Sequence, residues 1–214
     1  MGTLPAEYSR AIRAVRTAKF FFWSLMAIAI VAQLVIFGLV AWGGALDPLY
    51  KTAEAVSQPA TSSAAVEKAE QLRATFQWVL AVTEFAAMVF GVLLLSSLGL
   101  AVQITLAGRL GGVEALVSAF FWAVLLLVFL VPWQYAFASS PFSGALFDYN
   151  DLYGFTREVK ASWGATNVPW LKLIAYHGRF LAYPIVAVLI WLLVDLKFRR
   201  GCRSMIVTAA GPAA

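Results

Sequence analysis

The sequence predicts an all-α integral membrane protein with four transmembrane helices, both ends in the cytoplasm, and a short amphipathic segment in the second outer loop. Of its 214 residues, 62% are apolar and only 13% are charged, whereas a typical soluble domain is about half apolar and about a quarter charged. So few charges cannot cover a globule of this size, and lipid is the solvent that fits. Four long apolar stretches and the distribution of Lys and Arg supply the rest of the prediction.

Four apolar stretches meet the requirement of about 20 mainly apolar residues for a membrane helix. They are residues 20–42, 75–106, 116–138 and 173–196. We expect an N-terminal cytoplasmic segment, a four-helix transmembrane domain and a cytoplasmic tail, at residues 1–19, 20–198 and 199–214. The first stretch follows basic residues, as a signal peptide would. Because a signal core has only about 7–15 apolar residues, we expect a retained anchor, with cleavage as the alternative.

The lysines and arginines predict the orientation. One side would hold the N-terminus, the turn at 107–115 and the C-terminal tail, and it is strongly basic: Arg10, Arg13, Arg16, Lys19, Arg109, Lys197, Arg199, Arg200 and Arg203. The two loops of the other side mix both signs of charge. Basic residues beside spans stay in the cytoplasm, so we place both termini there. We expect a cell membrane, most plainly a bacterial inner membrane.

The two outer loops differ in composition. The first ends in residues 63–74, whose charges have helical spacing and predict an extension of the second span. The second loop, 139–170, is rich in aromatic residues, and residues 148–163 predict a short amphipathic helix that Gly154 weakens. Rings in water are costly, so we expect this loop to lie on the membrane surface or against a partner. Small residues Ala87, Gly91 and Gly99 form a stripe on the second span where another helix can approach closely.

Glu84 and Arg179 are the candidate functional residues within the spans. Ionisable residues inside a membrane are costly, so they are paired or functional. One interpretation makes Glu84 a protonatable group on an ion path. The other, which we favour, pairs it with Arg179 directly or through one water molecule. Both residues lie near the outer ends of their helices, and a paired carboxylate is cheaper than an isolated one.

His177 is the single histidine and Cys202 the single cysteine. One histidine and one cysteine are too few ligands, so the sequence predicts no zinc site, no bis-histidine haem and no iron–sulfur cluster held by this chain. We expect His177 to hydrogen-bond loop backbone. Ligation of a haem or chlorophyll-type metal from one side stays open, so the cofactor is unknown.

The function that these features favour is not enzymatic. The sequence has no phosphate-binding glycine loop and no set of residues for nucleophilic catalysis. Its basic charge is explained by topology rather than by nucleic acid. We expect a non-catalytic accessory subunit of a larger membrane complex, plausibly energy-transducing or transport, with membrane lipids and other membrane subunits as partners. The alternative is a small homo-oligomeric transporter or channel that uses Glu84.

Overall fold

The computed structural model describes residues 6–44, 47–49, 63–133, 144–163 and 170–210. These residues form helices and no strand, which confirms the all-helical prediction. Four of the helices are long and apolar enough to cross a membrane, as a multi-pass membrane protein requires. They span Tyr8–Ala41, Val66–Ala107, Val113–Leu130 and Lys172–Met205.

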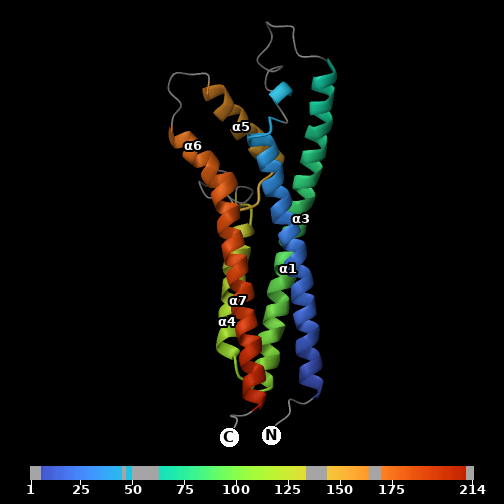
Figure 1. Ribbon diagram of the computed structural model, residues 1–214, viewed down its shortest axis with the longest axis vertical. Coiled ribbons are helices and arrows are strands. Elements are labelled where there is room, and N and C mark those ends of the chain that lie inside the picture. Colours follow the sequence, from blue (N-terminus) through green and yellow to red (C-terminus); the bar gives the residue numbers. More distant parts are fainter. Residues whose placement is uncertain (1–5, 45–46, 50–62, 134–143, 164–169, 211–214) are drawn as a thin grey trace. The chain divides into compact units, whose positions relative to one another are not determined.

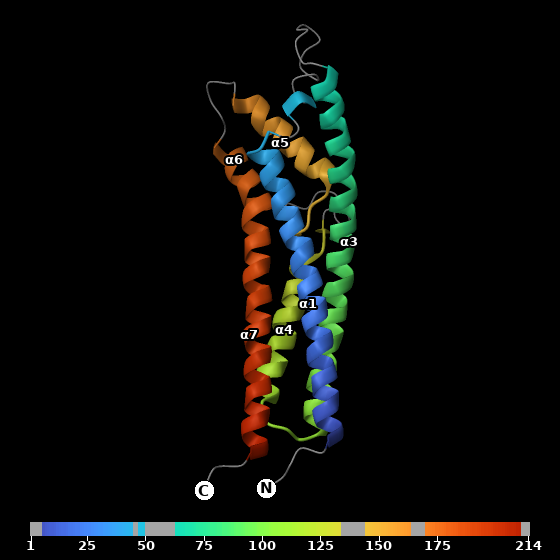
Figure 2. The same cartoon turned by 45° about the vertical axis from the view of Figure 1, so that its right-hand side comes forward.

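The helices follow the predicted order (Figures 1 and 2). They are α1 (Ala6–Ala41), α3 (Ser63–Ala107), α4 (Val113–Leu130), α5 (Tyr149–Trp163), α6 (Trp170–His177), the π-helix η2 (Gly178–Ala182) and α7 (Tyr183–Ala210). Helix α3 has 45 residues, about 67 Å at 1.5 Å per residue, against a hydrocarbon core of about 30 Å. Its start at Ser63 confirms that the second span is extended, and α5 confirms the amphipathic helix of the second loop.

Helix α4 ends earlier than the sequence predicted. Its last residue is Leu130, whereas the apolar stretch continues to residue 138. Val131 has φ −55° and ψ 127°, an extended conformation, because the ring of Pro132 disfavours helical geometry in the preceding residue. Residues 134–138 lie outside the described part of the chain.

The chain divides into two compact units. The first contains residues 1–28, 86–131 and 186–214, and the second contains residues 29–85 and 132–185. Helices α1, α3 and α7 each contribute a segment to both units.

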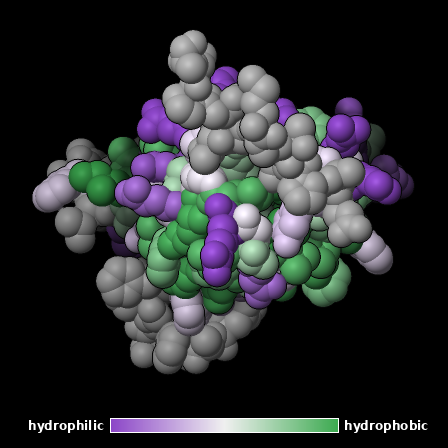
Figure 3. Space-filling model, turned by 90° about the horizontal axis from the view of Figure 1, so that it is seen from below, coloured by the Kyte–Doolittle hydropathy of each residue, from purple (hydrophilic) through white to green (hydrophobic). Residues whose placement is uncertain are grey.

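In the first unit, the turn between α3 and α4 contacts the start of α1 and the end of α7 (Figure 1). Gly112 has φ +83°, and a Cβ there would lie 2.3 Å from the hydroxyl of Ser204 and 2.5 Å from the carbonyl oxygen of Gly201. A Cβ on Gly108 would lie 3.2 Å from the ring of Tyr8. In the view from below, hydrophilic and apolar residues lie beside each other on the surface (Figure 3).

The small-residue stripe of α3 lies against α4, as the sequence predicted for a close helix approach. A Cβ on Gly91 would lie 3.1 Å from Leu127, and one on Gly99 would lie 3.5 Å from Phe120. The absence of side chains at these two glycines therefore lets the two helices pack closely.

The second unit has an aromatic core that includes the second outer loop. Phe37, Phe147, Tyr149, Tyr176 and Phe180 are each at most 3% exposed and belong to one apolar cluster. The expectation that the loop's aromatic residues lie on the membrane surface or against a partner is therefore wrong for Phe147 and Tyr149, which pack against their own chain. Burial of each ring contributes roughly 1.5–3 kcal/mol. The rings gain this energy by packing against the apolar residues of their own chain. Phe142 lies outside the described residues.

Candidate functional site

Arg179 lies in the π-helix η2, where α6 continues into α7. The backbone N–H of Tyr183 donates to the carbonyl of Gly178, five residues earlier. Pro184 has no N–H to donate to Phe180, and its ring would clash with that carbonyl in a regular helix. The wider π turn relieves this clash, and such turns are frequent at functional sites. The proline therefore explains the irregular geometry of the segment that carries Arg179.

Arg179 forms an ion pair with Asp151 in the first turn of α5. The guanidinium also lies 5.2 Å from the ring centroid of Phe155 and 5.5 Å from that of Phe180. The side chain is 17% exposed and that of Asp151 is 29% exposed. This pair joins helix α5 to the start of the fourth span.

The start of α5 is built around two acidic residues. The side chain of Asp148 accepts a 2.7 Å hydrogen bond from the backbone N–H of Asp151, as a helix N-cap does. Burial raises the pKa of Asp151, Arg179 acts to lower it, and Asp148 acts to raise it. The desolvation of the carboxyl is the largest of these effects, although the ion pair opposes it.

Glu84 lies in α3, half-buried, and forms no ion pair with Arg179 or with any other residue in the described part of the chain. The predicted direct pair is thus wrong, because Arg179 is taken by Asp151. The charges that act on Glu84 come instead from two acids, Asp148 and Asp151. A contact with Arg179 through a water molecule stays a prediction, and so does the role of Glu84 on an ion path.

His177 ends α6, and its Nδ1 lies 3.0 Å from the carbonyl oxygen of Leu173, one turn earlier in the same helix. Its ring meets that of Tyr176 edge-on, with 5.2 Å between the centroids. The partner is helix backbone rather than the loop backbone expected. No group of three His, Cys, Asp or Glu residues that could hold a metal occurs among the described residues. Ligation of a haem or chlorophyll-type metal by His177 from one side stays an alternative that the sequence alone raises.

Helix α5 is held by further polar contacts in the same unit. The hydroxyls of Thr156 and Tyr176 are 2.9 Å apart and both residues are buried. Lys160 pairs with Asp47, and Glu158 lies 3.6 Å from Lys172. Together with the Arg179 pair, these contacts fix a helix in place. None of them sets a nucleophile beside a base.

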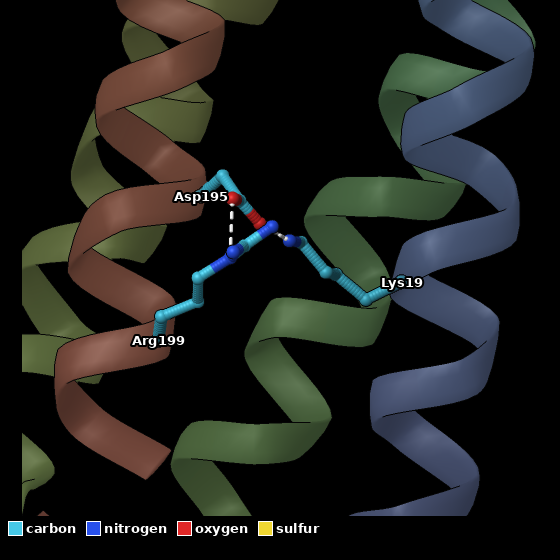
Figure 4. A network of polar contacts seen from close by, with 3 residues as sticks. All are labelled: Lys19, Asp195 and Arg199. Carbon is cyan, nitrogen blue, oxygen red and sulfur yellow. Dashed lines mark hydrogen bonds and ion pairs between the residues drawn. The ribbon is translucent and has the colours of Figure 1, made fainter. Parts of the chain in front are cut away.

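A second charged network, which the sequence did not predict, lies in the first unit. Asp195 of α7 binds the ammonium of Lys19 with one carboxylate oxygen, and its other oxygen lies 2.6 Å from Nε of Arg199 (Figure 4). The Lys19 side chain is only 4% exposed. The four-residue spacing of Asp195 and Arg199 was a visible signal. Lys19 stands 176 positions from Asp195, so its sequence position indicates only the topology and not this partner.

No known protein family matches the chain, and neither a curated protein nor a solved structure matches it.

Proposed function

We propose that the chain is a non-catalytic accessory subunit of a larger membrane complex, plausibly a bacterial energy-transducing or transport assembly. The pairing of its charges supports this. Lys19, Asp195, Arg179 and Asp151 are all engaged in ion pairs that join the protein's own helices. Charges used in this way hold a scaffold together and are not available for chemistry.

The main support for this proposal is one face of α3, which has the residue types of a helix-docking surface. Trp78 and Phe85 are 74% and 72% exposed, and with Gln77 and the small residue Ala81 they line a groove of about 590 Å³. Small residues let a second helix approach, and an amide among apolar side chains finds its hydrogen-bond partner on such a helix. The occupant that fits is a transmembrane helix of another subunit.

Purification of the full-length chain in a mild detergent from its native membrane tests the proposal. Other polypeptides should co-migrate with it and be identifiable by mass spectrometry. Ala81→Trp should fill the groove and release them. Val79→Trp is the matched control, since Val79 is exposed on α3 outside the groove. A homogeneous oligomer of this chain alone would contradict the proposal.

The cytoplasmic location of both termini belongs to the same proposal. It is supported by the basic side described above and by the contact of the α3–α4 turn with the start of α1 and the end of α7. Cys202, the single cysteine, is partly accessible near the end of α7. An impermeant thiol reagent should not label it in intact cells and should label it after the membrane is opened. Labelling from outside would reverse the orientation.

A second function, a small homo-oligomeric transporter or channel, is favoured by one observation. Glu84 is the ionisable group within the apolar stretch of α3, and it has no ion pair among the described residues. Ionisable groups inside a membrane mark ion paths. Reconstituted protein should then carry protons or cations across vesicles, and Glu84→Gln should abolish the flux. A flux that is unchanged by Glu84→Gln would exclude this function for Glu84.

A further inference from the structure

The first unit contains a basic cavity between α1 and α7 that the proposed subunit role does not use. The cavity has a volume of about 300 Å³. Four cationic side chains line it together with one carboxylate: Arg16, Lys19, Arg199, Arg203 and Asp195. Arg16 and Lys19 are three residues apart on α1, and Asp195, Arg199 and Arg203 follow at intervals of four on α7. These spacings place each set on one face of its helix, so the two faces form the cavity.

The cavity has an excess of positive charge that the protein itself does not neutralise. Its one carboxylate, Asp195, is shared between Lys19 and Arg199. Arg16 and Arg203 are exposed, and they form no ion pair within the described residues. Repulsion among cations at close range is costly. A bound anion would remove this cost, so the lining is complementary to an anion.

The pairing with Asp195 also orders the cations around the cavity. The Lys19 ammonium lies 5.0 Å from the ring centroid of Phe198 and 5.5 Å from that of Trp23. Arg199 uses Nε to bind the carboxylate, as Figure 4 shows, which leaves its two Nη groups for another acceptor. Arginine forks match the geometry of phosphate oxygens. Asp195 is therefore a positioning residue for the anion site.

The depth of the cavity indicates where the anion comes from. On α1 the basic residues end at Lys19 and the apolar stretch begins at Phe20, while on α7 the apolar stretch ends at Leu196 and basic residues follow. The cavity thus lies where hydrocarbon meets headgroups, whichever side of the membrane faces it. Phe20 lines it and is 61% exposed, an apolar surface suited to the glycerol and upper acyl region of a lipid.

We propose that this cavity binds the phosphate of an anionic phospholipid headgroup. Basic pockets between membrane helices bind such headgroups through the same chemistry. A zwitterionic lipid presents a phosphate too, but its ammonium group would meet Arg16 and Arg203. The site therefore selects lipids with net negative charge. The inference does not depend on the proposed subunit role.

The test uses the full-length protein in a neutral detergent, titrated with short-chain phosphatidylglycerol and followed by native mass spectrometry. The wild type should retain phosphatidylglycerol at least about tenfold more tightly than phosphatidylcholine. Arg16→Gln with Arg203→Gln should weaken phosphatidylglycerol binding at least about tenfold, because each basic residue near a headgroup contributes about a factor of five. Both side chains are exposed, so the lipid-free unfolding temperature should stay unchanged.

The matched control removes two arginines that do not line the cavity, Arg13→Gln with Arg200→Gln, and should change the affinity less than about threefold. Equal losses in the two double variants would show general attraction to a basic surface and overturn the site. Equal retention of the two lipids would overturn it as well. In a separate arm at constant ionic strength, inorganic phosphate should not displace the lipid. Displacement of the lipid by inorganic phosphate at equal concentration would assign the cavity to free phosphate instead.

Discussion

In each unit a buried or half-buried cation is paired with a carboxylate of another helix and lies near two aromatic rings. In the first unit Lys19 joins two spans, α1 and α7, with its side chain 4% exposed. In the second unit Arg179 joins the start of a span to helix α5, which lies between the third and fourth spans in the sequence, and its side chain is 17% exposed. The two pairs share their chemistry but differ in burial and in what they connect.

The difference in burial predicts how much each ion pair contributes to stability. Removing one partner of a well-buried pair leaves a charge with no water to solvate it, at a cost of about 3–5 kcal/mol. A pair that water reaches contributes much less, about 0–1 kcal/mol at a fully exposed site. We therefore expect the first unit to depend globally on its network, and the second to depend on its pair only for the attachment of α5.

The largest expected effect follows removal of Asp195. Asp195→Asn should lower the free energy of unfolding by about 3–5 kcal/mol, because it leaves the Lys19 ammonium buried and unpaired. Arg199, 62% exposed, can turn to water and contributes little to this loss. The unfolding temperature of the purified protein in detergent measures the effect.

The control for Asp195 is a double variant. Lys19→Met with Asp195→Asn removes both charges and keeps the length of the buried side chain, so it should recover more than half of the loss. Losses that simply add would show that the two residues stabilise the protein independently and would contradict the greater importance of the buried pair.

The next effect in size concerns Tyr149 and depends on pH. Its hydroxyl is buried and has no hydrogen-bond partner among the described residues. Burial is the main cause that raises the pKa of Tyr149 from 10.0 to about 12, although Arg73 acts to lower it. Between pH 10 and about 12 the Tyr149 hydroxyl therefore keeps its proton in the folded protein and loses it in the unfolded chain. Stability should be full below pH 10 and should fall by about 2–3 kcal/mol as the pH rises to about 12.

Tyr149→Phe should remove this alkaline loss and leave stability at neutral pH unchanged or raised by up to about 1 kcal/mol, because an unpaired buried hydroxyl is removed. Unfolding temperatures across the alkaline range measure both. Tyr153→Phe is the control, since it keeps the Tyr149 hydroxyl and the stacked ring and removes only the Tyr153 hydroxyl. Because Tyr153 is a lesser cause of the raised pKa of Tyr149 than burial, most of the alkaline loss should remain in this variant. An alkaline loss that persists in Tyr149→Phe would assign it to another group.

The Arg179 pair should give a smaller and more local effect. Arg179→Gln should lower stability by about 1–2 kcal/mol, between the values for surface and buried pairs. Amide hydrogen exchange should accelerate in α5 and stay unchanged in α4, which belongs to the other unit. Asp151→Asn should cost less, because burial opposes the Asp151 carboxylate and its removal relieves that desolvation. Exchange that rises equally in both helices would contradict a local clamp.

The sequence predicted the elements better than their partners. Each span is a run of apolar residues, and α5 follows a helical spacing of apolar side chains, so both can be recognised within a short stretch. The partner of Arg179 could not. Counted from the outer ends of the expected spans, Glu84 and Arg179 have similar depths, whereas counts from the inner ends differ. Whether α5 folds back onto the start of the fourth span depends on tertiary packing, which neither count contains. The same holds for Lys19 and Asp195, which lie at opposite ends of the chain.

The smallest expected effect is that of Glu84→Gln, and it separates the two interpretations of this residue. Glu84 has no ion pair among the described residues and is influenced by Asp148 and Asp151, so its neutralisation should leave stability unchanged or raise it by less than about 1 kcal/mol. Combined with Arg179→Gln, the changes should add within about 0.5 kcal/mol, as for residues without a shared contact. A coupling above about 1 kcal/mol in this cycle would show that the two side chains interact, as the water-mediated contact predicts. Additive changes would show that Glu84 does not interact with Arg179, which is the outcome that the ion-path interpretation of Glu84 predicts.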